Sequence, residues 1–168
     1  RLRLRLLGPL AVSAGGELRP LPPSRKVRAL LAYLAVAPRP VSRSQLCALF
    51  WDVPDDPRGE LRWALAKIRS LLRSEDAAPL TSADDHVALD RSALTVDALE
   101  VESELRTDVA ALATERLAAL AGLFAGEFLA GSDLDRCPAF QAWLVARRQA
   151  CRSQREANAT QELGAADG

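Results

Sequence analysis

The chain opens with a strict alternation of charged and apolar residues. Residues 1–6 read Arg-Leu three times, and a period of two is typical of a strand with one buried face. Gly8 and Pro9 end this segment. Two further apolar stretches, 10–12 and 18–21, flank a glycine pair, so we predict a small antiparallel sheet of about three strands.

Apolar residues then recur at helical spacing. Ser24 is a good N-cap for a first helix, which Pro38 ends. A second, short helix begins near residue 43, because Ser42 and Gln45 form an S-x-x-Q capping box. These features predict two consecutive helices between residues 24 and 51.

A third helix is predicted from Pro57, with Asp56 as its cap, to about residue 74. One narrow face of this helix is apolar and consists of Leu61, Leu65, Ile68 and Leu72. The opposite side carries Trp63 and Lys67, and one flank is lined by Arg62, Arg69 and Arg73. The pattern therefore predicts a helix with a core side and a basic outer side.

Two short apolar stretches, 80–82 and 87–89, bracket residues 83–86 (ADDH) and predict a hairpin. A sheet, three helices and a hairpin in this order are typical of a winged helix-turn-helix. In that fold the third helix lies in the DNA major groove.

After residue 93 the chain becomes acidic and rich in Ala and Leu. We predict helices over 96–105 and 117–124, a loop over 126–137 and a long final helix from Pro138, with no strand. The predicted domains are a winged helix over 1–92 and a partial, all-α helical domain over 93–168. The fold class is α+β, mainly α, and we expect the helical domain to be cut short at residue 168.

Charge divides the chain in the same way. The formal net charge is zero, but residues 1–75 hold 14 Lys and Arg against 6 Asp and Glu, whereas residues 76–168 hold 8 against 16. A basic part joined to an acidic part favours a polyanion-binding module with a second role attached, although chance segregation of solvated charges remains an alternative. The two parts could also attract each other, so that the acidic part competes with DNA for the basic helix face.

The composition argues against an enzyme. The hydrophobic fraction of 49% is enough for a real core. The three cysteines lack CxxC spacing and read as buried hydrophobes, which leaves no disulfide framework or zinc site. We find no phosphate-binding loop, nucleophile elbow or HExxH motif. We expect no cofactor, no catalytic residues and no bound metal. Without a long apolar run or a signal peptide, we expect a cytoplasmic chain that does not meet the membrane.

Five stretches carry a family resemblance in this order along the chain: residues 4–10 (LRLLGPL), 28–34 (RALLAYL), 61–69 (LRWALAKIR), 126–131 (GEFLAG) and 138–144 (PAFQAWL). Together they resemble the bacterial regulators of the SARP type. Members of that family combine an OmpR-like winged helix with a bacterial transcriptional activation domain, and larger members continue into TPR-like helical repeats.

The resemblance implies a transcription regulator that binds direct repeats in double-stranded DNA, often as a side-by-side homodimer. The helical domain would pass activation to RNA polymerase or receive a signal. At the matching positions Trp63 and Lys67 would face base edges. The phosphate-binding residues would be Arg58, Arg62, Arg69 and Arg73. Two alternatives stay open, namely that Trp63 is an aromatic at a domain interface and that the arginines form a solvated face.

The predicted wing departs from the family pattern. Where a glycine-rich, aromatic wing near basic residues is common, this chain has residues 82–86 (SADDH), and the carboxylates of Asp84 and Asp85 repel phosphate. Either the wing points away from DNA or toward the helical domain, or the fold no longer binds DNA tightly. The alternative function is therefore a degenerate winged helix that serves as a protein-interaction or signal-coupling module.

Overall fold

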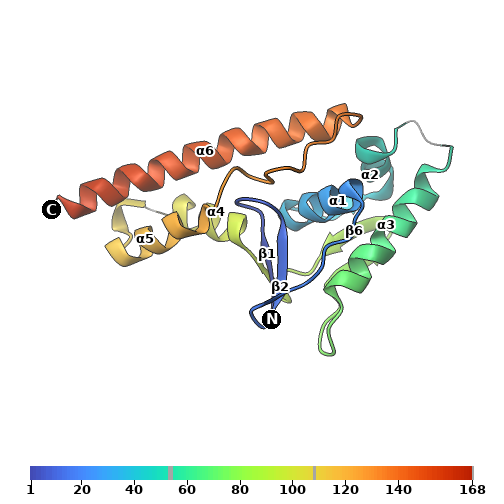
Figure 1. Ribbon diagram of the computed structural model, residues 1–168, viewed down its shortest axis with the longest axis horizontal. Helices are drawn as coiled ribbons and strands as arrows, with labels where there is room; N and C mark the ends of the chain where they lie inside the picture. The colour runs from blue at the N-terminus through green and yellow to red at the C-terminus, as the bar shows by residue number, and fades with distance from the viewer. Residues whose placement is uncertain (53–54, 108, 168) are drawn as a thin grey trace.

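The computed structural model describes residues 1–52, 55–107 and 109–167. It is an α+β fold in which helices dominate, as the sequence predicts (Figure 1). The strands all lie within the first 96 residues, and the described residues after them form helices and loops. We call residues 97–167 the helical part.

The first sheet has the strand order β3-β2-β1-β7. β1 (Leu2–Arg5) pairs antiparallel with β2 (Ala11–Ala14), which pairs antiparallel with β3 (Glu17–Leu18). These strands confirm the predicted N-terminal sheet. β7 (Leu94–Val96) pairs parallel with β1, so the prediction of no strand after residue 93 was wrong. Three residues are too few to show a period of two, and their pairing partner lies at the far end of the sequence.

The three predicted helices form where their caps place them. They are α1 (Arg25–Val36), α2 (Arg43–Phe50) and α3 (Pro57–Leu72). Each N-cap side chain accepts a backbone N–H three residues later: Ser24 from Val27 at 3.3 Å, Ser42 from Gln45 at 3.1 Å and Asp56 from Gly59 at 2.9 Å. The side chain of Gln45 donates to the Tyr33 hydroxyl at 3.2 Å. In the predicted capping box, the Ser42 hydroxyl thus accepts the backbone N–H of Gln45. The Gln45 side chain instead links α2 to Tyr33 of α1.

The predicted hairpin is also present and forms a second sheet with the strand order β4-β6-β5. Its strands are β4 (Val41–Ser42), β5 (Leu80–Ala83) and β6 (His86–Leu89). The turn consists of Asp84 and Asp85, with φ of 50° and 61°. Two successive left-handed residues make the turn type that matches the twist of a hairpin. This sheet completes the winged helix-turn-helix with α1, α2 and α3.

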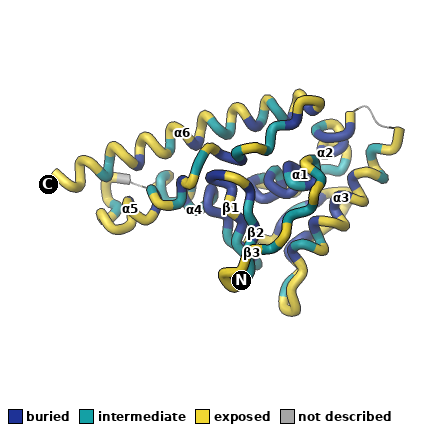
Figure 2. Tube along the Cα trace, in the orientation of Figure 1, coloured by how far each residue is buried: buried dark blue, intermediate teal, exposed yellow. Residues whose placement is uncertain are grey.

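The helical part contains α4 (Asp97–Arg106), the 3₁₀ turn η1 (Val109–Ala111), α5 (Thr114–Leu123) and α6 (Pro138–Ala166). The long helix α6 extends from α2, at the winged helix, to α5 at the opposite end of the molecule (Figure 1). Its outer end is mostly exposed (Figure 2). The buried Asn158 of α6 donates a side-chain hydrogen bond to the carbonyl of Leu117 in α5 at 3.1 Å.

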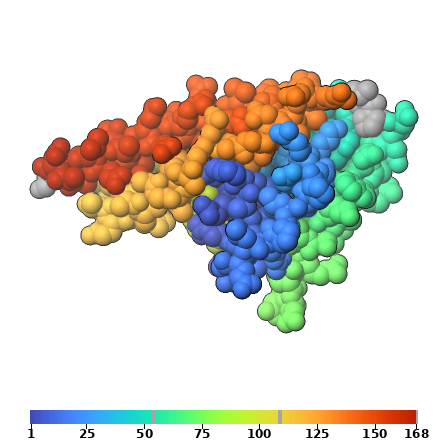
Figure 3. Space-filling model, viewed as in Figure 1, coloured from blue at the N-terminus to red at the C-terminus, as the bar shows by residue number. Residues whose placement is uncertain are grey.

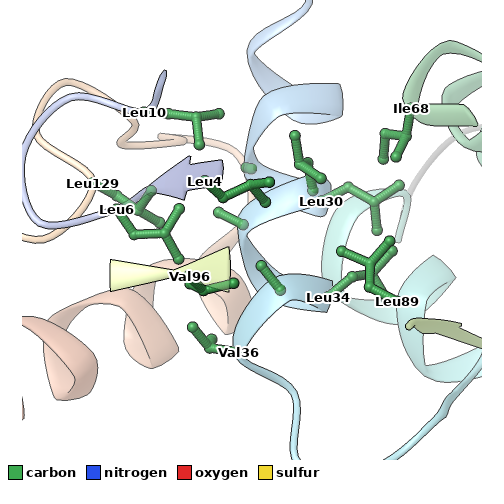
Figure 4. Close-up of a cluster of buried hydrophobic side chains, with 14 of the residues drawn as sticks. Leu4, Leu6, Leu10, Leu30, Leu34, Val36, Ile68, Leu89, Val96 and Leu129 are labelled. Atoms are coloured by element: carbon green, nitrogen blue, oxygen red, sulfur yellow. The ribbon is translucent and has the colours of Figure 1, made fainter. Parts of the chain in front are cut away.

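One hydrophobic core runs through both parts of the molecule. In Figure 4, Leu4 of β1 and Leu6 just after it lie on the same side of α1 as Val96 of β7 and Leu129 of the loop before α6. Leu30 of α1 extends to the other side of that helix, toward Ile68 of α3. The predicted domain boundary between residues 92 and 93 stays a prediction. The β1–β7 pairing and this shared core both cross it.

Two of the family-like motifs, residues 4–10 and 126–131, contact each other where the winged helix packs on the helical part. The backbone N–H of Leu129 donates to the carbonyl of Leu6 at 2.8 Å, and that of Ala125 donates to the carbonyl of Leu7 at 2.8 Å. Gly8 has a φ of 142°, and a Cβ atom there would lie 3.3 Å from the Cβ of Ala125. The close approach of the two segments therefore requires glycine at this position.

Candidate nucleic-acid interface

Helix α3 presents the predicted outer side to solvent. Its buried residues are Leu61, Ala64, Leu65, Ile68 and Leu72. The exposed residues include Arg62, Trp63, Lys67 and Arg73, and Arg69 is half-buried. The amphipathic pattern thus buries the apolar stripe and leaves four cations accessible.

These four cations form no ion pair within the part of the chain that the structure describes. Arg62 and Arg69 lie on one flank of α3, and Lys67 lies on the other. The helix was predicted to reach about residue 74 but ends at Leu72, so Arg73 is its C-cap, with an extended backbone (φ −64°, ψ 134°). The C-terminal end of the helix is held by Arg19, whose guanidinium donates to the carbonyls of Leu71 and Arg73. The arrangement provides a fixed, uncompensated positive surface, which is what a polyanion requires.

Trp63 and Lys67 interact with each other. The Lys67 Nζ lies 5.4 Å from the centroid of the Trp63 ring, and Trp63 is 50% exposed. Both side chains line a groove of about 340 Å³, whose opposite wall is residues 20–24. None of the described residues of the helical part lines this groove. The groove therefore gives no support to the alternative that Trp63 lies at a contact with that part.

Arg58 stands apart from the other predicted phosphate-binding residues. Its Nη1 lies 3.2 Å from Oδ1 of Asp85, and its Nη2 donates to the Ser44 hydroxyl at 3.2 Å. The hydrogen bond from Arg58 lowers the pKa of Asp85 below its usual value. Arg43 of α2 also belongs to this cluster, because its backbone N–H donates to the carbonyl of Asp85 at 2.9 Å.

The wing turn therefore contacts the N-terminal ends of α2 and α3. Of the alternatives for the wing, a contact with the helical part finds no support among the described residues. Sequence reasoning missed this cluster because Arg43 and Arg58 are distant from Asp85 along the chain. No local pattern in the sequence links these residues, so no signal was available to predict the contact.

The helical part leaves the outer face of α3 uncovered. Figure 3 shows α3, in green, at the lower right of the molecule, and the helical part, in yellow to red, along the top and the left. Helix α6 instead packs on α1 and α2 through aromatic rings. The ring centroids of Phe140 and Phe50 are 5.1 Å apart, and those of Trp143 and Tyr33 are 4.9 Å apart.

Many acidic side chains of the helical part are paired with arginines of the same part. Asp133 accepts from Arg148 at 2.9 Å, which lowers the pKa of Asp133 to about 2. Glu104 pairs with Arg116 at 2.7 Å. Between the two parts, the ion pair in the described residues is Arg3 with Glu100 at 3.2 Å. The structure thus gives no support to the idea that the acidic part covers the basic face.

Other kinds of site find little support. Cys47, Cys137 and Cys151 are free and buried, as predicted, and burial raises the pKa of Cys151 to about 11. Among the described residues, no three His, Cys, Asp or Glu side chains are grouped to hold a metal ion. None of the described helices is both long and apolar enough to cross a membrane.

Comparison with known proteins supports the fold. A scan against protein-family models found no match, and a search of curated proteins found none either. Among solved structures, the chain is similar to Mycobacterium tuberculosis EmbR in complex with a low-affinity phosphopeptide, with a TM-score of 0.74 and 24% sequence identity. The match covers 99% of this chain and 47% of that one, so this chain spans less than half of the other protein's length. At this identity the likeness shows that the two chains share a fold.

Proposed function

We propose that this chain is a DNA-binding transcriptional regulator whose helix α3 enters the major groove. The observation that carries the proposal is the outer face of α3, where four cations are accessible and make no ion pair among the described residues. The winged helix-turn-helix fold and the SARP-like order of motifs support the same function.

The proposed roles follow from where each side chain lies. Arg62 and Arg69, on one flank of α3, and Arg73, at its C-cap, contact phosphates, which supply salt-dependent affinity and fix the register. Lys67 donates to guanine acceptors, and Trp63 offers an apolar face to thymine methyl groups. Loss of Lys67 would then change the preference among sequences, whereas loss of an arginine would weaken binding to all of them.

In this proposal the helical part couples the winged helix to a signal or to RNA polymerase. The aromatic contacts of α6 with Tyr33 and Phe50 support this role, since a displacement of α6 would change its packing on α1 and α2. The proposal also includes a cytoplasmic location and a homodimer on direct repeats. The phosphopeptide in the EmbR complex is a ligand of that protein, and it is not part of the function proposed for this chain.

The test is fluorescence anisotropy of the chain on a labelled random duplex between about 50 and 200 mM salt. The chain should bind at 50 mM, and binding should weaken steeply with salt. Replacing Arg62, Arg69 and Arg73 together by Gln should abolish most of the binding and reduce the slope of log K against log salt by about 2 to 3.

The matched control replaces three other exposed arginines by Gln, namely Arg5, Arg39 and Arg136, none of which has an ion pair in the described residues. The net charge changes by the same amount, but the face of α3 is intact. An equal loss of DNA affinity in both triple variants would show that net charge alone causes the loss. That result would contradict an interface on α3. Absence of binding by the unaltered chain at 50 mM would reject the proposal.

The groove beside Trp63 favours a second candidate, a module that binds a protein partner without tight DNA binding. Its walls include Pro20, Leu21, Pro22, Pro23 and Leu71, which are apolar. An exposed aromatic at the rim of an apolar groove is typical of protein contacts. The anisotropy experiment separates the candidates, because a chain of this second kind stays off DNA even at low salt.

A further inference from the structure

Two arginines face the carboxylate of Asp85, and each of them also donates to a serine hydroxyl. Arg58 approaches it with Nη1 at 3.2 Å from Oδ1 and Nη2 at 3.4 Å from Oδ2. The Nε of Arg43 lies 3.8 Å from the same Oδ1. The hydroxyls are held by the guanidinium groups themselves: Arg58 donates to Ser44 at 3.2 Å, and Arg43 donates to Ser82 at 3.0 Å.

This cluster has the chemistry of a phosphate site. A guanidinium that offers two N–H groups to two oxygens of one anion is the usual arrangement for phosphate as well as carboxylate. Arg43 and Ser44 are the first two residues of α2, and the N-terminal end of a helix favours an anion. Asp85 is the anion that occupies the cluster.

The cluster is also in line with the proposed DNA contact. Arg58 lies on the flank of α3 that carries Arg62 and Arg69, one turn from Arg62. A DNA strand that follows this flank would reach the cluster next. There it would meet the carboxylate of Asp85, which is paired with Arg58. The other arginines of the flank have no acidic partner among the described residues.

We propose that Arg43 and Arg58 form a phosphate-binding cluster that Asp85 occupies as a built-in competitor, so that these two arginines make no contact with the DNA backbone while Asp85 is present. This inference rests on the proposed DNA-binding function and deepens it. It explains how a wing with two carboxylates is compatible with an OmpR-like fold. One acid is neutralised by the protein, and the affinity for DNA is lowered by the loss of two phosphate contacts.

The decisive variant is Asp85→Asn, measured by the same anisotropy titration. Asparagine tolerates the left-handed φ of 61° at this position, so the turn is retained. The variant should bind DNA more tightly, and its slope of log K against log salt should be steeper by about 1 to 2, since each new phosphate contact adds about 0.9. The advantage of the variant over the unaltered chain should therefore shrink as salt is added. For each freed arginine, the ratio of the two affinities should be about threefold smaller at 200 mM than at 50 mM salt.

The matched control is Asp84→Asn in the same turn. Asp84 also has a left-handed φ, of 50°, but its carboxylate has no ion pair in the described residues. It should therefore gain affinity through reduced repulsion with little change in slope. The double variant Asp85→Asn with Arg58→Gln should lose about half of the added slope. Thermal unfolding followed by circular dichroism verifies that each variant is folded.

The outcomes separate this inference from the function on which it rests. If the unaltered chain binds DNA and Asp85→Asn binds with the same affinity and slope, DNA binding stands and the built-in competitor is rejected. Equal gains from Asp84→Asn and Asp85→Asn would also reject it in favour of general repulsion. If neither the unaltered chain nor Asp85→Asn binds at 50 mM salt, both proposals fail together.

Discussion

At the scale of single residues, Asp97 is a buried acid whose carboxylate is held by backbone N–H groups. It is 1% exposed, and its carboxylate accepts three backbone N–H groups: Leu6 at 2.7 Å, Leu7 at 3.1 Å and Ala98 at 2.7 Å. Burial raises the pKa of Asp97, and these hydrogen bonds act in the opposite direction. Asp97 thereby joins the end of the N-terminal strand to the first turn of α4.

We expect Asp97→Ala to destabilise the whole fold. The amides of Leu6 and Leu7 would lose their acceptor inside the protein, at about 1 to 3 kcal/mol each, which gives a total of about 2 to 6 kcal/mol. Urea unfolding followed by circular dichroism measures the loss. Asp135→Ala, at an exposed acid with no ion pair in the described residues, is the control. A loss below about 0.5 kcal/mol for Asp97→Ala would contradict this role.

At the scale of elements, the helices that local signals mark were predicted from the sequence. The strands that depend on pairing with distant segments were not. Ser24, Ser42 and Asp56 mark helix starts because a capping side chain needs only the next three residues. The strands β4 and β7 escaped prediction, since each has two or three residues and pairs with a strand far along the chain.

The candidate site divides in the same way. The exposed face of α3 follows from a period of 3.6 and was predicted from sequence. The ion pair of Arg58 with Asp85 depends on how the hairpin folds back on α2, and no local pattern encodes that contact. Trp63 is an intermediate case, because its exposure was predicted but the groove it forms with residues 20–24 was not.

The loop before α6 offers a prediction about pH. Arg148 of α6 binds this loop through the carboxylate of Asp133 and the carbonyl of Phe128. Because Arg148 and Gln141 lower the pKa of Asp133 to about 2, the ionised pair stabilises the fold above the ordinary pKa of 3.8. That contribution is lost as the pH falls from about 4 through about 2.

The variant Asp133→Asn lacks the titrating group. Its thermal midpoint should lie below that of the unaltered chain at pH 7, and the difference should shrink between pH 4 and pH 2. Differential scanning calorimetry across this range gives both curves, and their difference removes the contribution of the other acids. A difference that is constant with pH would show that the ion pair does not contribute.

At the scale of the whole molecule, the two parts are joined by packing more than by charge. The opposite formal charges of the two parts suggested electrostatic association. Arg3 with Glu100 is the ion pair that crosses between them among the described residues, whereas the shared core includes Leu4, Leu6, Phe50 and Phe140. The basic face of α3 is therefore accessible without any movement of the helical part (Figure 3).

This architecture predicts what happens when the helical part is removed. If the acidic part competed for α3, a fragment of residues 1–92 should bind DNA more tightly. The fragment lacks β7, Asp97 and α6, so it would expose the apolar residues that they cover and leave the amides of Leu6 and Leu7 unpaired. We expect the fragment to lose cooperative thermal unfolding by circular dichroism and to bind DNA more weakly.

A variant of the whole chain tests separately whether the negative charge of the helical part lowers the affinity for DNA. Glu115→Gln with Glu156→Gln removes two exposed acids that have no ion pair in the described residues and leaves the core intact. Its DNA affinity should stay within about twofold of the unaltered chain, because the acids belong to α5 and to the C-terminal half of α6, which lie at the end of the molecule remote from α3 (Figure 1). A folded 1–92 fragment with higher affinity, or a large gain from the two Gln substitutions, would instead establish that the helical part restrains DNA binding.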